Sequence, residues 1–352
     1  MLLPNLEFIN TSPRGDHMEH DGSLSKFSDA ANAAFVTPLW ETFRDGMPTE
    51  PSSMQPFVWS WDTLNPLTQR AAEEVPMEHV ERRVLTLRNP YIEGSGSMTL
   101  VNLVGALQTL LPGETAPLHR HSGNALRFVI DGEGAETIVD GKHCIMTERD
   151  LIITPVWSWH GHTHGGKERI VWFDALDIPL FRHMNAGFFE GGPPPNLPKK
   201  LPDDAFVNGG FMPEQNDNTS SYSPMFRYPW DGVVSALEQL PKETDGSRKI
   251  RYVNPQTGGA VMSLIDCFVL AMEKGQKTKP YRTTSSAICV VAEGKGKSSV
   301  GDYSIEWKKN DIFTLPNWNS ISHLSQADET KLFMVTDREV LNRLGMLRDE
   351  FV

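Results

Sequence analysis

Three histidines in this 352-residue chain have the spacing of a metal site. His119 and His121 are two residues apart, and His160 ends the run Pro155-Val-Trp-Ser-Trp-His. Residues i and i+2 of a strand point to the same side, so these two imidazoles would share one space. A third imidazole from a later strand would complete a facial set with open positions, which suits a transition metal that binds a substrate and dioxygen. The alternative is that these are solvated strand-end histidines.

Three arginines are candidates for binding an acid near that metal. Arg127 lies in the apolar run Leu126-Arg-Phe-Val-Ile, an even number of residues after His121, so we expect it to face the same interior. A guanidinium there could fix a carboxylate through two parallel hydrogen bonds, the alternative being a surface ion pair. Arg82 and Arg83 are adjacent and point to opposite faces of a strand. We expect Arg83 to reach the carboxylate and Arg82 to face solvent.

Other polar residues near the third histidine suggest supporting roles. His162 follows His160 by two residues, and an imidazole can exchange a proton near neutral pH, so His162 is a candidate acid or base. His164 is its rival. Asp174 and Asp177 follow a strand, and one of them is expected to orient a ligand imidazole, with Asp174 the better candidate.

The rest of the chain predicts the elements that position these groups. Residues 1–30 are polar and predict a mobile arm, and 31–81 mix helical and alternating patterns, which indicates a packing segment. Residues 82–185 consist of short strands separated by Gly, Pro and Asp, as in a sandwich or barrel. A segment rich in Pro and Gly opens a linker over 186–245. The final segment, 246–352, is again strand-rich.

The two strand-rich segments are copies of each other. Residues 112–134 match 274–296, with Gly113, Ala125, Gly132 and Gly134 in the places of Gly275, Ala287, Gly294 and Gly296. Such self-similarity predicts two copies of one β-domain. In the second copy the three histidines are replaced by Tyr281, Thr283 and Ile321, so we expect no metal there. His323, opposite His162, is expected to be structural.

Composition excludes several classes of protein. Lys+Arg total 33 and Asp+Glu 45, a formal charge of −12 that disfavours nucleic acid as a partner. The three cysteines have no Cys-x-x-Cys spacing, so neither a disulfide framework nor a thiolate zinc site is expected. No stretch is apolar enough to cross a membrane. We therefore expect a cytoplasmic protein with no membrane partner.

These motifs resemble a known family. Gly113, His119, His121, Gly132, Pro155 and His160 look like the two sequence motifs of the cupin superfamily. The longer run His119-Arg-His-Ser-Gly-Asn-Ala-Leu-Arg-Phe-Val-Ile-Asp-Gly resembles gentisate 1,2-dioxygenases and their salicylate and 1-hydroxy-2-naphthoate dioxygenase relatives. The resemblance covers most of the chain. It implies a mainly β bicupin fold, with two double-stranded β-helix (jelly-roll) barrels and an N-terminal helical segment.

The resemblance also implies a function. The expected enzyme is a ring-cleaving dioxygenase with one Fe(II) per chain, which splits an aromatic ortho-hydroxy acid between its carboxyl- and hydroxyl-bearing carbons using O2. Gentisate is the first expectation, and salicylate, substituted salicylates and 1-hydroxy-2-naphthoate are alternatives. The ligand types alone leave manganese, nickel and zinc open. A storage or binding bicupin is the non-enzyme alternative, although it would not need the three histidines.

Further expectations come from comparing this sequence with the family pattern. Gln108 matches a position near the substrate, and a homotetramer is typical. Trp40, Trp59 and Trp61 could pack against a neighbouring chain. Many cupins have a glutamate ligand after the second histidine, but here the stretch Gly123-Asn-Ala-Leu-Arg has no carboxylate, which leaves three neutral ligands. The small residues of Leu103-Val-Gly-Ala-Leu indicate an open, apolar ring pocket.

Overall fold

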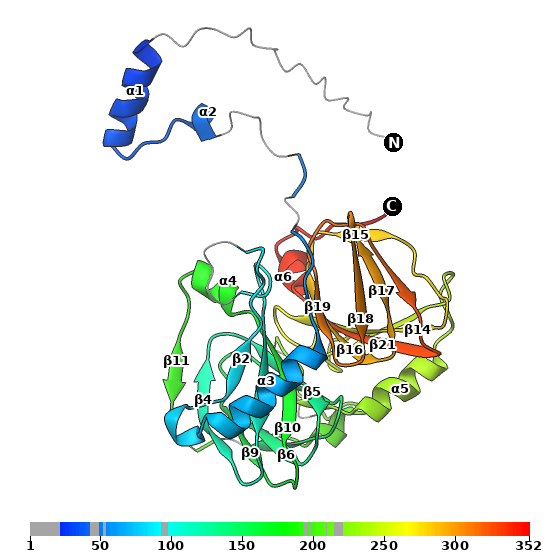
Figure 1. Ribbon diagram of the computed structural model, residues 1–352. Helices are drawn as coiled ribbons and strands as arrows, with labels where there is room; N and C mark the ends of the chain where they lie inside the picture. Colours follow the sequence, from blue (N-terminus) through cyan, green and yellow to red (C-terminus); the bar gives the residue numbers. More distant parts are fainter. Residues whose placement is uncertain are drawn as a thin grey trace. The chain divides into compact units, whose positions relative to one another are not determined.

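The computed structural model describes residues 22–42, 49–51, 54–92, 98–192, 196–197, 199–208, 210–214 and 221–352 (Figure 1). The chain separates into two compact units, residues 1–50 and 51–352. In the first unit, the described residues form helices α1 (Gly22–Ala33) and α2 (Leu39–Thr42). Of the expected mobile arm, residues 1–21 lie outside the described residues and 22–30 belong to α1. No described helix is long and apolar enough to span a membrane.

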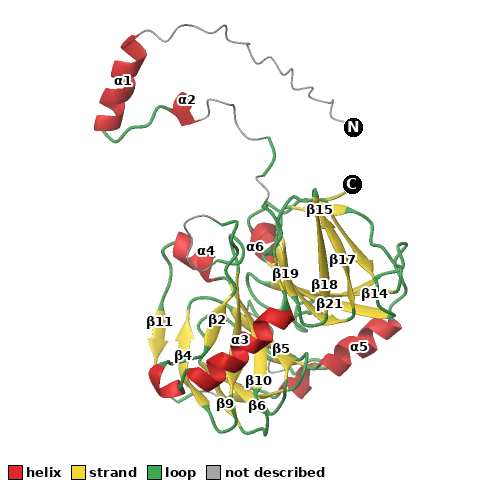
Figure 2. Cartoon of the chain, viewed as in Figure 1, coloured by secondary structure: helices red, strands yellow, loops and turns green. Residues whose placement is uncertain are grey.

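Strands dominate the second unit, where two sheets form the first barrel (Figure 2). A six-stranded sheet has the order β12-β8-β5-β10-β3-β2, and a five-stranded sheet has the order β11-β4-β9-β6-β7. The strands are β2 (Val84–Thr86), β3 (Val104–Leu110), β4 (Thr115–His121), β5 (Ala125–Asp131), β6 (Ala135–Val139), β7 (Lys142–Met146), β8 (Leu151–Thr154), β9 (His160–His164), β10 (Ile170–Leu176), β11 (Phe189–Gly191) and β12 (Arg227–Tyr228).

The second barrel repeats this arrangement. Its six-stranded sheet has the order β1-β19-β16-β21-β14-β13, and its five-stranded sheet has the order β18-β17-β20-β15-β22. The strands are β1 (Val58–Trp59), β13 (Arg248–Arg251), β14 (Asp266–Glu273), β15 (Tyr281–Thr283), β16 (Ala287–Glu293), β17 (Lys295–Val300), β18 (Tyr303–Lys308), β19 (Ile312–Leu315), β20 (Ile321–Ser325), β21 (Glu329–Thr336) and β22 (Asp349–Phe351). The expectation of a mainly β bicupin is confirmed.

The two six-stranded sheets pack against each other through their outer faces. Phe128 of β5 and Phe333 of β21 stack with ring centroids 4.2 Å apart, and both side chains are buried in one apolar core that spans the barrels. Short helices cover the ends and edges of the sheets: α3 (Trp61–Glu74), η1 (Met77–His79), α4 (Ile178–His183), η2 (Asp203–Phe206), α5 (Trp230–Gln239) and α6 (Arg338–Arg343).

The same turn in each barrel requires a glycine. Gly132 and Gly294 follow β5 and β16 with φ of +87° and +84°, a conformation that favours glycine. A Cβ at Gly132 would lie 2.5 Å from the Arg169 carbonyl oxygen, and one at Gly294 would lie 2.4 Å from that of Glu329. Both turns therefore need glycine for its φ and for its lack of a side chain.

The segment that precedes the first barrel contacts both barrels. Strand β1 adds to the second barrel, because Val58 pairs with Phe313 and Trp59 with Ile312 of β19. Helix α3 then returns to the first barrel, where Thr68 accepts a hydrogen bond from Arg169. The expected packing segment 31–81 is thus divided at residue 50, and its later part joins the two barrels.

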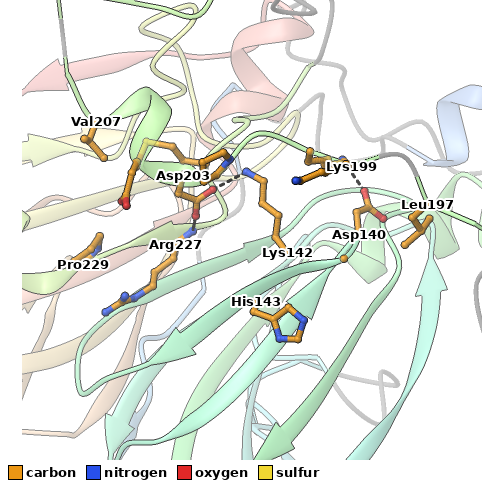
Figure 3. Close-up of a pocket in the computed structure, with 14 residues that line it drawn as sticks. Asp140, Lys142, His143, Leu197, Lys199, Asp203, Val207, Arg227 and Pro229 are labelled. Carbon is orange, nitrogen blue, oxygen red and sulfur yellow. Dashed lines mark hydrogen bonds and ion pairs between the residues drawn. The ribbon is translucent and has the colours of Figure 1, made fainter.

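The connecting segment expected over 186–245 also carries structure. β11 pairs with β4 and β12 pairs with β8, so both strands extend sheets of the first barrel beyond residue 185. Ion pairs join other parts of this segment to the first barrel around a surface hollow of about 660 Å³. There the Lys142 ammonium points to Asp203 and donates a hydrogen bond to it (Figure 3). Lys200 likewise bonds Asp140, so these lysines already have partners.

Candidate metal centre

The three histidines predicted from spacing meet at one end of the first barrel. His119 pairs with His160 across β4 and β9, and one ring nitrogen of each of the three imidazoles lies within 4.8 Å of the others. His119 and His160 are buried and His121 is half-buried. Three imidazoles from two adjacent strands can coordinate a divalent metal while leaving positions open.

Backbone carbonyls orient two of these rings, those of His121 and His160. Nδ1 of His121 lies 2.8 Å from the Gly123 oxygen and Nδ1 of His160 lies 2.9 Å from the Ser158 oxygen. Because a carbonyl only accepts, each Nδ1 carries the proton and each Nε2 lone pair is free for a metal. His160 Nε2 is buried and makes no hydrogen bond to a described residue. The site therefore fits a metal ion.

The ligands are neutral imidazoles. Burial, with smaller contributions from nearby arginines, lowers the pKa of His119 to about 3, and burial lowers the pKa of His121 to about 4. Burial also places the pKa of His160 well below its usual value. Neutral imidazole is the form that binds metals.

Arg127 and His162 lie deeper in the same barrel and bond each other. Both are buried, and Arg127 Nε donates to His162 Nε2 at 3.2 Å. The other nitrogen, Nδ1, lies 3.0 Å from Thr137 Oγ1. Because Nε2 accepts, the neutral ring of His162 carries its proton on Nδ1 and donates it to Thr137. Burial and then Arg127 hold the pKa of His162 well below its usual value.

Asp174 supports Arg127 rather than a ligand imidazole. Its Oδ1 lies 3.6 Å from Arg127 Nε and accepts a hydrogen bond from Trp172 Nε1 at 3.1 Å. Arg127 Nη1 also donates to Thr154 at 2.9 Å, whereas its Nη2 makes no hydrogen bond to any residue that the structure describes. The expectation that Asp174 orients a ligand imidazole is wrong. Backbone carbonyl oxygens accept the hydrogen bonds from Nδ1 of His121 and His160 instead.

The two adjacent arginines point to opposite faces, but the choice between them was wrong. Arg83 is buried away from the metal site, where its guanidinium bonds both carboxylate oxygens of Glu114. Arg82 faces the site: its Nη2 lies 2.7 Å from His119 Nδ1 and donates to the Pro117 oxygen at 2.8 Å. Arg82 therefore replaces Arg83 as the candidate for binding an acid.

Gln108 lies on the interior face of the barrel. It pairs with Trp172 of β10, and its amide nitrogen is buried without a hydrogen-bond partner among the described residues. A buried donor without a partner carries a free-energy cost, which a ligand can remove. Gln108 is thus available to donate to a bound acid.

Two other candidates have structural roles. His164 is buried, but its Nε2 lies 2.7 Å from the Glu168 oxygen and its Nδ1 accepts from the Gly166 N–H. Asp177 accepts hydrogen bonds from the backbone N–H and the side chain of Asn124, both at 2.7 Å. Neither side chain contacts a ligand imidazole through these bonds.

Comparisons with known proteins agree with this site. Residues 106–178 match the Cupin domain family. Gentisate 1,2 dioxygenase 1 of Aquipseudomonas alcaligenes is 35% identical over 89% of this chain and 92% of its own length. The chain belongs to the gentisate 1,2-dioxygenase family of ring-cleaving dioxygenases.

Other members of this family are similar over most of their length. A 1-hydroxy-2-naphthoate 1,2-dioxygenase from Nocardioides sp. (strain KP7) is 33% identical over 84% of this chain and 78% of its own. A salicylate 1,2-dioxygenase variant from Pseudoaminobacter salicylatoxidans, solved in complex with gentisate, superposes with a TM-score of 0.88 at 32% identity. That match covers 96% of this chain and 97% of the other. The resemblance inferred from the motifs is confirmed, and an enzyme family is favoured over a storage protein.

Proposed function

We propose that this protein cleaves the ring of gentisate with O2, using one Fe(II) held by His119, His121 and His160. The observation that carries the proposal is a facial set of three neutral imidazoles beside two arginines and an unpaired buried amide. This site contains two arginines and no carboxylate ligand, so it suits an acidic substrate that brings its own negative charge. A ferrous ion would supply the site at which the acid and O2 meet.

The protein residues bind and orient the acid. Arg127 Nη2, Arg82 and Gln108 Nε2 are the donors available to its carboxylate, and Asp174 lies beside Arg127 as its counterion. Charge-assisted hydrogen bonds of this kind fix a carboxylate in position as well as binding it.

His162 is proposed to receive the phenol proton. Its Nε2 lone pair is bonded to Arg127 Nε, so the lone pair becomes available when the substrate carboxylate draws Arg127 away. The Nδ1 proton remains on the Thr137 side, and the ring can then accept a proton at Nε2 alone. Arg127 and His162 would thus act as a coupled pair.

The substrate is tested by oxygen uptake with iron-reconstituted protein against gentisate, salicylate, 5-aminosalicylate and 1-hydroxy-2-naphthoate. Gentisate is expected to give the highest kcat/KM. A higher value for 1-hydroxy-2-naphthoate would reassign the substrate, and Val104 and Ala106, the small residues along β3, are the observation that favours this alternative. No uptake with any of these acids would contradict ring cleavage.

We also propose that the enzyme is a homotetramer. Phe188 and Phe189, beside the metal centre, are 70% and 61% exposed, and Phe351 on β22, the strand that corresponds to β11 in the second barrel, is 84% exposed. Exposed aromatic side chains of this size are typical of subunit interfaces. Light scattering that gives the mass of a monomer at micromolar concentration would contradict the proposal.

A further inference from the structure

The second barrel contains a cavity at the place where the first barrel has its metal centre. Tyr281 pairs with Ile321 as His119 pairs with His160, and both side chains line an open cavity of about 740 Å³. Phe268, Leu270 and Ile321 give it apolar walls. The loss of the metal ligands has therefore left an open space, not a filled core.

One cation in this cavity has no counterion. Lys249 lines the wall, with its ammonium 4.7 Å from the centroid of Phe268 and 5.9 Å from that of Tyr281. Within the described chain, no carboxylate lies within ion-pair distance of it. The acids nearby are already bonded: Asp349 to both terminal nitrogens of Arg338, and Asp266 to Arg251.

A buried imidazole, that of His323, also lines the cavity. His323 is 1% exposed, and its Nε2 makes no hydrogen bond to a described residue. Its Nδ1 lies 2.8 Å from Ser298 Oγ, which accepts a hydrogen bond from Trp307 Nε1 at 2.8 Å. Among the described residues, His323 Nδ1 is the acceptor for the Ser298 hydroxyl proton. Burial and then Lys249 lower the pKa of His323 to about 3, so the ring is neutral. Because Nδ1 accepts from Ser298, the single ring proton lies on Nε2.

The first barrel has the opposite arrangement at the same positions. There Thr137 takes the place of Ser298 and donates to the Met146 sulfur at 3.3 Å, and Met146 takes the place of Trp307. His162 consequently directs a lone pair inward, and Arg127 covers it. Cys289 replaces Arg127 in the second barrel, and no described side chain there makes a hydrogen bond to the Nε2 of His323.

We propose that the second barrel binds a small carboxylic acid with an apolar body, without a metal. The carboxylate lies between the Lys249 ammonium and the His323 Nε2–H, and the apolar body lies against Phe268, Leu270 and Ile321. An ammonium and a ring N–H are both donors, so the ligand must supply acceptors and negative charge. The apolar side chains among the lining residues favour an acid with an apolar body over a strongly hydrated ion such as inorganic phosphate.

The test is a ¹⁹F NMR titration of the full-length, iron-loaded protein with 4-fluorobenzoate. Two sites are expected per chain, one in each barrel. K249M should weaken one site at least tenfold, R127L should weaken the other, and K249R should retain the second-barrel site. K274M, on an exposed lysine paired with Asp328, is the matched control and should leave both sites unchanged. 4-Fluorobenzamide, which has the same shape without the charge, should bind the second barrel at least tenfold more weakly.

Two further measurements make the assignment specific. K249M should retain the parent kcat/KM for ring cleavage, because Lys249 lies in the other barrel. Two-bond ¹H–¹⁵N spectra should show the Nε2–H form for His323. An unchanged titration in K249M, a single site removed by R127L alone, or a proton on His323 Nδ1 would overturn the proposal.

Discussion

His162 and Arg127 are joined by one hydrogen bond, 3.2 Å long, from the guanidinium Nε to the imidazole Nε2. An arginine side chain keeps its protons, so the direction of this bond is fixed and His162 must accept. The residue expected to move a proton and the residue expected to bind the carboxylate are therefore not independent.

Arg127→Leu should retain the metal but lose kcat/KM. The variant removes a donor to the substrate carboxylate and leaves Asp174 buried without its cation. We therefore expect kcat/KM to fall by an amount that corresponds to about 2–4 kcal/mol of lost transition-state stabilisation. Steady-state oxygen uptake and metal analysis on the same preparation measure both properties. Parent-like kinetics would remove Arg127 from the substrate site.

His162→Ala should lower turnover more than it raises KM. General acid–base catalysis typically contributes about 10²–10⁴-fold, and we expect kcat to fall by that amount. His143→Ala is the matched control, because His143 is largely exposed on β7 and bonds only Glu136 among the residues that the structure describes. A kcat for the His162 variant equal to that of this control would contradict the proton-transfer role.

Replacing His119, His121 or His160 with Ala should strip most of the metal while leaving the fold intact. The parent should contain about one metal per chain, because Tyr281, Thr283 and Ile321 occupy the ligand positions of the second barrel. Elemental analysis and circular dichroism measure these two outcomes. Two metals per chain, or full metal content in any of the three variants, would show that the ligands are assigned wrongly.

Arg82 and Arg83 should separate function from stability. Arg83→Met leaves Glu114 without its ion-pair partner and should destabilise the protein by about 3 kcal/mol, with kcat/KM near the parent value. Arg82→Met should do the reverse, because it removes a donor beside His119. The measurements are the free energy of unfolding in urea and kcat/KM for both variants. Equal effects of the two substitutions on both properties would contradict the assignment of Arg83 to stability and Arg82 to substrate binding.

Asp177 should make stability depend on pH. Burial raises its folded pKa to about 7, although its hydrogen bonds from Asn124 oppose this. A raised carboxyl pKa means that the folded state holds the proton more tightly, so this contribution to stability is complete below about pH 4 and is lost as pH rises through 7. The difference in the free energy of unfolding between the parent and Asp177→Asn should therefore fall between about pH 4 and pH 7 and level off above that. Asp302→Asn, on an exposed turn, should show no such trend.

Local sequence patterns could predict part of this site. The two-residue spacing of His119 and His121 and the internal repeat both depend on strand geometry, which the sequence records directly. The same alternation correctly placed Arg82 and Arg83 on opposite faces. It could not say which face is interior, because that depends on Glu114, 31 residues away from Arg83.

Contacts between distant residues could not be predicted. Nothing in Val58-Trp59 indicates that it pairs with β19, and Pro66 inside α3 obscures a helix that packing stabilises. Asp174 was expected to orient a ligand imidazole, because carboxylates often bond to histidine ligands. Here the backbone carbonyls of Gly123 and Ser158 orient His121 and His160. The tautomers of His162 and His323 depend on neighbours such as Met146 and Trp307, which only the register of the sheets identifies.

The pairing of β1 with β19 constrains how this chain folds during synthesis. The Phe57 N–H donates to Thr314, 257 residues later, so β1 stays without its partner strand until most of the chain has left the ribosome. An open edge strand is a template for pairing with another chain, and contacts this distant in sequence slow folding. The first barrel can therefore collapse early, while the segment ahead of it must remain extended and available until the second barrel is complete.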